Sequence, residues 1–168
     1  MLAEKVAEAL QKQIANEGSA SSSYLGMASW CEVQGLRGCA EFLYEQSSEE
    51  REHMMKIIRY LNQAGGHAEI PALKEPLNKY KTVSEVFTAA LKQEQGVTQS
   101  INKIVEMSLD EKDFVSFNFL QWFVGEQLEE ENLFRCILDI IKISGSDPRS
   151  LLLIDNEIAK IRAAKSGS

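Results

Sequence analysis

The sequence is poor in residues that interrupt or cross-link a chain. Only three of its 168 residues are proline, which favours long helices over a fold rich in turns. No apolar run approaches the ~20 residues that a membrane-spanning helix needs, so we expect no membrane segment. Cys31, Cys39 and Cys136 are odd in number and lack the spacing of metal fingers. We expect them to be free, reduced thiols that lie partly in the core.

The chain also lacks an excess of positive charge. Its 25 acidic residues outnumber 18 lysines and arginines, and the net charge is −7. This balance argues against nucleic-acid binding, and no basic stripe offsets it. Residues 1–5 do not have the layout of a signal peptide, which predicts a cytoplasmic protein. The length and the ordinary apolar fraction predict a single domain over residues 1–168 with a substantial core.

Apolar residues recur at helical spacing over four long segments and a short fifth one. Glycine follows three of the long segments, as is common at helix ends. Asp147 and Pro148 have the residue types of an N-cap and a first helical residue. The predicted helices cover about residues 4–33, 37–63, 83–108 and 111–143, followed by a short helix after Pro148.

The lengths of the connections predict how these helices are arranged. The first and third connections are only a few residues long, so each should join an antiparallel hairpin. A helix of ~27 residues is ~40 Å long. The link over residues 65–82 contains Pro71 and Pro76, and about 18 residues can stretch to ~60 Å. The prediction is an all-α, ferritin-like four-helix bundle with one long crossover and a short fifth C-terminal helix.

Each long helix has a stripe of residues at spacings of three and four, which should face the inside of the bundle. The stripes are mostly apolar, yet each has a glutamate in its interior. Helix by helix, they are Val6, Leu10, Gln13, Glu17, Ala20, Tyr24 and Met27; Leu43, Gln46, Glu50, His53, Ile57 and Leu61; Val83, Phe87, Ala90, Glu94, Val97, Ile101 and Ile104; Leu120, Phe123, Gln127, Glu130, Phe134, Ile137 and Ile141.

The polar members of these stripes can meet at one depth in the bundle. Residues three apart share a helix face, so Glu50 reaches the same point as His53, and Gln127 the same point as Glu130. Two alternatives remain open: the glutamates lie on the surface, or they form a buried cluster without metal. Burying ionised carboxylates costs several kcal/mol each unless they are compensated. The stripes contain no lysine or arginine, so bound cations are the favoured compensation.

Carboxylates with one imidazole suit iron or manganese better than a structural zinc ion. Di-iron bundles combine single glutamates from two helices with Glu-x-x-His from the other two. Here Glu17 and Glu94 are the single glutamates, and Glu50-x-x-His53 is one such pair. The fourth helix has Gln127-x-x-Glu130 instead, so one metal should have a nitrogen ligand and the other only oxygen ligands.

Further acids lie beside this cluster in the sequence. Glu49 precedes Glu50, and Glu126 and Glu129 flank Gln127. These residues form either a solvated helix face or a third, weaker cation position.

Several motifs together resemble those of bacterial-type non-haem ferritins over nearly the whole chain. They include Glu17 with Tyr24, the Gln-Glu-Gln setting of Glu94 and the Leu-Leu-Leu-Ile-Asp run that ends at Asp155. The others are Glu49-Glu50-x-x-His53 and the run Phe117-Asn118-Phe119-Leu120-Gln121-Trp122 that leads to Glu126-Gln127-x-Glu129-Glu130.

The resemblance implies a role for each matching residue. Glu17, Glu50 and His53 would bind one iron ion. Glu50, Glu94 and Glu130 would bind the second, with Glu50 bridging and Gln127 close by. Tyr24 would stand beside the pair and give an electron during oxidation. The residues implied for a third iron are Glu49, Glu126, Glu129 and Glu130.

The resemblance further implies a ferroxidase that oxidises Fe²⁺ to Fe³⁺ with O₂ or H₂O₂. It implies a hollow homo-oligomeric shell of 24 subunits that stores iron as a mineral, without haem. Gly18 directly follows Glu17 at the start of a serine-rich stretch. Glycine costs up to about 1 kcal/mol inside a helix, so this stretch is either loosened or packed closely against a neighbour.

Other functions remain as alternatives. Bacterioferritins use a histidine where this chain has Glu130, and they hold haem with a methionine where this chain has Glu52, although Met54 and Met55 are near. An iron-detoxifying oxidase without a major storage role would share the same centre. A rubrerythrin-like peroxidase would need a cysteine module that is missing here, and mini-ferritins usually lack a fifth helix. A purely structural subunit would not need the full set of acids.

Overall fold

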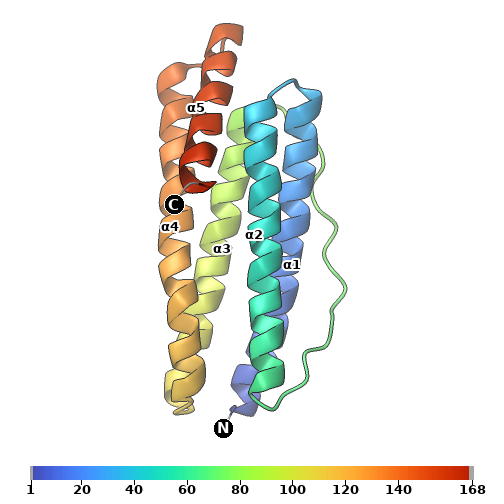
Figure 1. Cartoon of the computed structure of the whole chain (residues 1–168), viewed down its shortest axis with the longest axis vertical. Helices are drawn as coiled ribbons and strands as arrows, with labels where there is room; N and C mark the ends of the chain where they lie inside the picture. Colours follow the sequence, from blue (N-terminus) through green and yellow to red (C-terminus); the bar gives the residue numbers. More distant parts are fainter. Residues whose placement is uncertain (1, 167–168) are drawn as a thin grey trace.

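The computed structural model describes residues 2–166 and has five helices with no strand in that range. Four long helices form an elongated bundle, and the fifth lies against one end of it (Figure 1). This arrangement confirms the predicted fold class. The helices are α1 (Glu4–Val33), α2 (Arg37–Gln63), α3 (Val83–Asp110), α4 (Phe114–Ser144) and α5 (Pro148–Ser166).

The helix ends agree with the predictions except at the turn between α3 and α4. Gly35, Gly65 and Gly145 have φ angles of 81°, 92° and 89°, which glycine adopts without strain. The predicted start of the fourth helix at residue 111 is wrong. Lys112 has a φ of 55° and the side chain of Asp113 accepts a hydrogen bond from the Ser116 amide. The chain therefore turns before this N-cap, and α4 begins three residues later than predicted.

The segment between α2 and α3 crosses the whole length of the bundle along the outside of α1 (Figure 1). It makes α2 and α3 parallel, as the length of the link predicts. Helix α1 is continuous at Gly18 and packs closely there. A Cβ atom on Gly18 would lie 2.6 Å from Leu73 Cδ2 of the crossover and 3.0 Å from Met54 Sδ. Close packing, not loosening, therefore accounts for Gly18.

All residues of the four predicted stripes are buried. The apolar ones divide into two clusters, one towards each end of the bundle. The first cluster includes Met27, Phe42, Phe87 and Phe134, and the second includes Leu10, Ile57, Ile101 and Phe123. Charged and polar members of the stripes lie between the two clusters along each helix, which makes the core a sandwich of apolar, polar and apolar layers.

Helix α5 is held against the start of α2 by backbone and side-chain contacts. Asp155 Oδ1 accepts a hydrogen bond of 2.8 Å from the Cys39 amide, and Arg162 Nε lies 2.6 Å from Glu45 Oε1. Cys31 and Cys39 are buried in this region while Cys136 is exposed, and all three are free thiols, as predicted. Within residues 2–166, no helix combines the length and the hydropathy needed to cross a bilayer.

Candidate metal centre

The polar layer brings together five side chains from all four long helices. Glu17 comes from α1, Glu50 and His53 from α2, Glu94 from α3 and Glu130 from α4. None of these residues exposes more than 6% of its surface. The side chains point inward, as their spacing predicts. Their roles as metal ligands remain predictions.

Three of these residues form a tight group. One potential ligand atom from each of Glu17, Glu50 and His53 lies within 4.8 Å of the others. Within the group, His53 Nδ1 lies 3.3 Å from Glu50 Oε2. Two carboxylates and an imidazole at this spacing are a suitable donor set for a divalent transition metal. Glu94 and Glu130 do not belong to this tight group.

Glu94 and Glu130 accept hydrogen bonds from tyrosine and glutamine side chains that surround the group. The Tyr24 hydroxyl donates to Glu94 Oε1, and Gln127 Nε2 donates to Glu94 Oε2 at 3.1 Å. Gln46 Nε2 donates to Glu130 Oε2 at 2.7 Å. Gln127 therefore lies beside the expected second metal position and acts as a donor to one of its acids.

Two carboxylate oxygens at the centre of the group accept no hydrogen bond of good geometry, although His53 Nδ1 approaches one of them to 3.3 Å. They are Glu17 Oε2 and Glu50 Oε2, and both are buried. A buried carboxylate oxygen without a partner is costly, and polar atoms of this kind often point to an ion or a water molecule. The donor chemistry of these two oxygens and the imidazole of His53 fits a cation such as iron.

Burial and mutual repulsion make the acids hard to ionise without a cation. Burial, followed by the charge of Glu50, raises the pKa of Glu17 well above its ordinary value. Burial and the charge of Glu94 do the same to the pKa of Glu50. The pKa of Glu94 rises to about 7, chiefly through burial. A bound divalent cation would reverse these effects, because it attracts the ionised carboxylates.

The pKa of the Tyr24 hydroxyl is also raised well above its ordinary value, first by burial and then by the charge of Glu94. Tyr24 is fully buried and its ring stacks on that of Phe134. It therefore stays a neutral phenol whose hydrogen is directed at Glu94.

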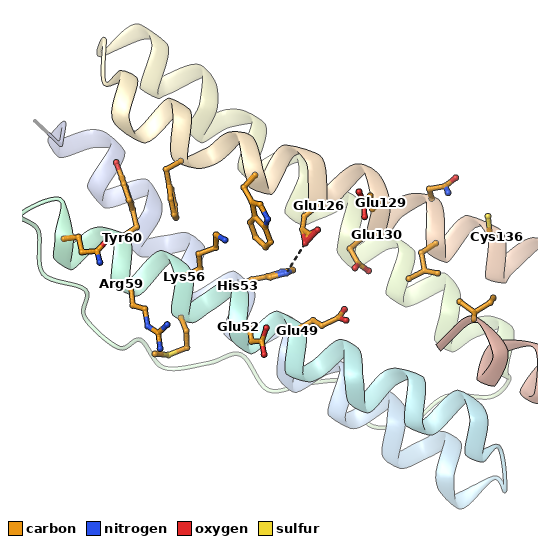
Figure 2. Close-up of a pocket in the computed structure, with 17 residues that line it drawn as sticks. Glu49, Glu52, His53, Lys56, Arg59, Tyr60, Glu126, Glu129, Glu130 and Cys136 are labelled. Carbon is orange, nitrogen blue, oxygen red and sulfur yellow. Dashed lines mark ion pairs between the residues drawn. The ribbon is translucent and has the colours of Figure 1, made fainter. Parts of the chain in front are cut away.

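A groove of about 1170 Å³ connects the polar layer with solvent. Residues of α2 and α4 form most of its walls, with Ile161 of α5, and both His53 and Glu130 line it. Figure 2 shows the side chain of His53 extending from α2 towards Glu126 on α4, where His53 Nε2 and Glu126 Oε2 are 3.9 Å apart.

The acids expected at a third cation position line the same groove. Glu49 and Glu126 are half-buried, Glu129 is exposed, and Glu130 is buried at the inner wall. All four lie near the middle of the groove, between Tyr60 on one side and Cys136 on the other, on the two helices that face each other there (Figure 2). The arrangement suits a weakly held cation between the polar layer and solvent, and whether one binds remains a prediction.

Some residues beside the site were not assigned a role from the sequence. Lys56 Nζ lies 3.7 Å from the centre of the Trp122 ring, and the ring centres of Trp122 and His53 are 5.3 Å apart. In the sequence, Lys56 follows His53 by three residues, a spacing that places both on one face of the helix. Gln13 and Gln46 lie on the predicted stripes, where an uncharged polar residue beside buried acids could have suggested a supporting role.

Comparisons with known proteins agree with this geometry. A family model described as a ferritin-like domain matches residues 7–143. The chain is 42% identical to a bacterial non-heme ferritin of Campylobacter jejuni, with 98% of this chain and 99% of that protein covered. It is 35% identical to a bacterial non-heme ferritin of Staphylococcus aureus, over 94% of this chain and 95% of that protein.

Among solved structures, the chain is similar to an open-pore ferritin from the hyperthermophilic archaeon Archaeoglobus fulgidus. The two have a TM-score of 0.92 and 36% sequence identity, and the match covers 95% of this chain and 98% of the other.

Proposed function

The chain belongs to the ferritin family, and from that premise we propose that it oxidises Fe²⁺ in the polar layer of its bundle and stores the product as a ferric mineral. Glu17, Glu50 and His53 hold the first iron ion. Glu94 and Glu130, together with Glu50 as a shared ligand, hold the second. Iron is the substrate and the cargo of this site, and no haem takes part.

The observation that carries the proposal is the tight buried group of Glu17, Glu50 and His53, in which Glu17 Oε2 and Glu50 Oε2 accept no hydrogen bond of good geometry. A structural role for such a cluster would require partners for these atoms. Metal binding provides those partners and also offsets the repulsion among the acids.

The reaction transfers one electron from each of two Fe²⁺ ions. With O₂ as oxidant, two Fe²⁺ and two protons give two Fe³⁺ and H₂O₂. With H₂O₂ as oxidant, two Fe²⁺ and two protons give two Fe³⁺ and two water molecules. The carboxylates favour the higher charge of Fe³⁺ more than neutral ligands would, which makes the loss of the electrons easier.

Tyr24 is the residue proposed to supply a further electron to the oxidant. Its hydroxyl already donates a hydrogen bond to Glu94 Oε1. When the phenol loses an electron, its proton passes along this bond to the carboxylate, so charge does not accumulate on the buried ring. The full burial of Tyr24 restricts side reactions of the phenol with solvent.

The groove between α2 and α4 is the proposed path of iron between the oxidation site and the mineral. Its acids Glu49, Glu126 and Glu129, with Glu130, form a third position where iron is held in passing. Storage requires that copies of the chain assemble into a closed homo-oligomeric shell, in the cytoplasm. Size-exclusion chromatography tests this assembly, because an 18.8 kDa chain should elute as a particle of several hundred kilodaltons.

The oxidation step is tested by mixing metal-free protein rapidly with Fe²⁺ and O₂ and following ferric absorbance. Glu50→Ala and His53→Ala are expected to slow the first turnover by about 100-fold or more, because the loss of an active-site interaction of several kcal/mol has that effect. Glu41→Ala is the matched control, since Glu41 lies exposed on the same helix. A Glu50→Ala protein that oxidises iron as fast as the control would contradict the proposal.

A further inference from the structure

Three of the four buried glutamates in the polar layer each receive a hydrogen bond from a different buried glutamine. Gln13 Nε2 donates to Glu17 Oε1 at 2.9 Å, and Gln46 Nε2 donates to Glu130 Oε2 at 2.7 Å. Gln127 completes the set through its 3.1 Å bond to Glu94. The three glutamines expose 0%, 2% and 3% of their surfaces. The same arrangement, a buried amide that donates to a buried glutamate, thus occurs on three different helices.

The orientation of the Gln13 amide is fixed by its other neighbours. Ser100 Oγ donates to Gln13 Oε1 at 2.6 Å, and Asn16 Nδ2 donates to the same oxygen at 3.0 Å. Since two donors occupy the amide oxygen, the amide nitrogen must face Glu17. A rotation of the amide by 180° would bring its oxygen against the carboxylate and its hydrogens against Asn16, so the reverse orientation is disfavoured.

The orientation of the Gln127 amide is fixed by acceptors instead. Its Nε2 faces the backbone oxygen of Glu94 at 3.2 Å and Thr98 Oγ1 at 3.4 Å, in addition to the Glu94 carboxylate. The Thr98 hydroxyl has Glu131 Oε1 as an acceptor at 2.6 Å, so its lone pairs remain available to Gln127. Three acceptors around one nitrogen leave only one favourable orientation of this amide.

A neutral donor has an advantage over a cation at these positions. Lysine or arginine would orient a carboxylate equally well, but its charge would offset the charge that attracts a metal ion. In the described part of the chain, Glu17, Glu50 and Glu94 form no ion pair with either residue type. The amides therefore orient the acids and leave their negative charge to the metal.

We propose that Gln13, Gln46 and Gln127 are positioning residues that each hold one glutamate in its metal-binding orientation, Gln13 for the first iron position and the other two for the second. The proposal rests on the proposed function, because it presumes that these glutamates bind metal. It assigns one supporting residue to the first position and two to the second, so the effects of substituting Gln13 and the other two glutamines should be separable.

Equilibrium titration of the metal-free full-length protein with Co²⁺, followed by its visible absorption, measures this directly. Methionine has nearly the volume of glutamine but no amide donor. Gln13→Met is expected to weaken one Co²⁺ equivalent by about 10- to 100-fold, the range typical of lost supporting hydrogen bonds at metal sites. Gln46→Met and Gln127→Met are each expected to weaken the other equivalent. Gln99→Met is the matched control, because Gln99 is exposed on α3, and it should bind like the parent.

A His53→Ala background assigns each glutamine to its position. This substitution removes the first position, so the remaining Co²⁺ reports on the second. In this background Gln13→Met should have little further effect, whereas Gln127→Met should retain its full effect. Should Gln13→Met fail to fold, Ser100→Ala serves instead, because it removes one of the two donors that fix the Gln13 amide and should weaken the same equivalent by a smaller factor.

The outcomes separate this inference from the proposed function. If the parent binds two Co²⁺ ions and the Gln13→Met, Gln46→Met and Gln127→Met variants all bind like the Gln99→Met control, the positioning roles are wrong while the metal centre stands. A Gln13→Met effect that persists undiminished in the His53→Ala background would also overturn the assignment. If the parent takes up no Co²⁺ in the bundle, the proposed function itself fails.

Discussion

The two ends of the bundle and its middle layer contribute to the stability of the fold with opposite signs. At the ends, the stripes of all four helices are apolar and fully packed, as around Phe134 at one end and Ile101 at the other. In the middle, the same stripes present four glutamates and a histidine. Burial of apolar surface stabilises the fold, whereas burial of carboxylates opposes it. The ends thus hold the helices together, while the middle layer destabilises the metal-free fold. Metal binding would offset this cost.

This division explains why a costly layer can persist. A helix of about 30 residues crosses all three layers, so the position of Glu17 is determined by Leu10 and Met27, which pack about two and three turns away on either side. The acids need not attract one another to stay close together. Their proximity is imposed by apolar packing at a distance, and the hydrogen bonds from glutamine and tyrosine only set their orientation.

The largest effect is expected when an apolar end is damaged. Phe134→Ala removes a buried ring that packs against Tyr24, Phe42 and Phe87, and should lower the free energy of unfolding by about 3–5 kcal/mol. Chemical denaturation of the metal-free protein measures it. Phe114→Ala is the control, because Phe114 is 65% exposed. Equal losses in the two variants would mean that the ends do not carry the stability.

A smaller effect, of opposite sign, is expected from filling the middle layer. Metal ions that bind only the folded state at about 100 times their dissociation constant should add about 2.7 kcal/mol of stability. The thermal midpoint with and without Co²⁺ measures the gain. Glu50→Gln should lose most of it, since Glu50 is proposed to contact both ions. A metal-induced gain as large in Glu50→Gln as in the parent would place the bound ions elsewhere.

The metal-free protein should become less stable as the pH rises from roughly pH 5 to pH 8. An unfolded glutamate has its ordinary pKa near 4.5, while folded Glu94 has a pKa of about 7 and those of Glu17 and Glu50 are also raised. Between these values the folded state binds more protons than the unfolded state, so removing protons favours unfolding. Thermal midpoints across this pH range measure the slope, which Glu94→Gln should flatten.

The slope is informative because surface carboxylates give the opposite trend. Acids that form ion pairs in the folded state have lowered pKa values and stabilise a protein as the pH rises. A metal-free protein whose midpoint increases steadily over this range would show that the middle layer does not dominate its pH dependence.

The smallest effects are expected from two glycines within helices. Gly96→Ala should raise stability by up to about 1 kcal/mol, since alanine is the better helix former and no atom lies within 4 Å of the added Cβ. Gly18→Ala should lose this gain, because its Cβ would displace Leu73 of the crossover. Denaturation midpoints of both variants test the difference, and Leu73→Ala combined with Gly18→Ala should restore part of it. An equal gain in both single variants would mean that Leu73 of the crossover does not pack closely enough against Gly18 to exclude a methyl group.

Much of this arrangement is predictable from the sequence because long amphipathic helices have a strong periodic signal. The spacing of three and four places Glu17, Glu50, Glu94 and Glu130 on the inner faces, and all four are buried there. The lengths of the links are enough to predict the one long crossover. These features depend on local pattern and chain length, which need no knowledge of side-chain packing.

Two of the features that were missed depend on contacts between segments far apart in the chain. Gln13 lies on the predicted stripe, but its pairing with Ser100 requires the register of α1 against α3. The packing reason for Gly18 depends on where Leu73 of the crossover lies. The wrong start of α4 has a local cause, since Lys112 adopts a positive φ that few residue types other than glycine, asparagine and aspartate favour.

Crystals soaked anaerobically with Fe²⁺ and measured at the iron absorption edge test the central claim most directly. The account predicts two anomalous peaks inside the bundle, one among Glu17, Glu50 and His53 and a second among Glu50, Glu94 and Glu130. Peaks found only at exposed acids, with the polar layer free of iron, would contradict it.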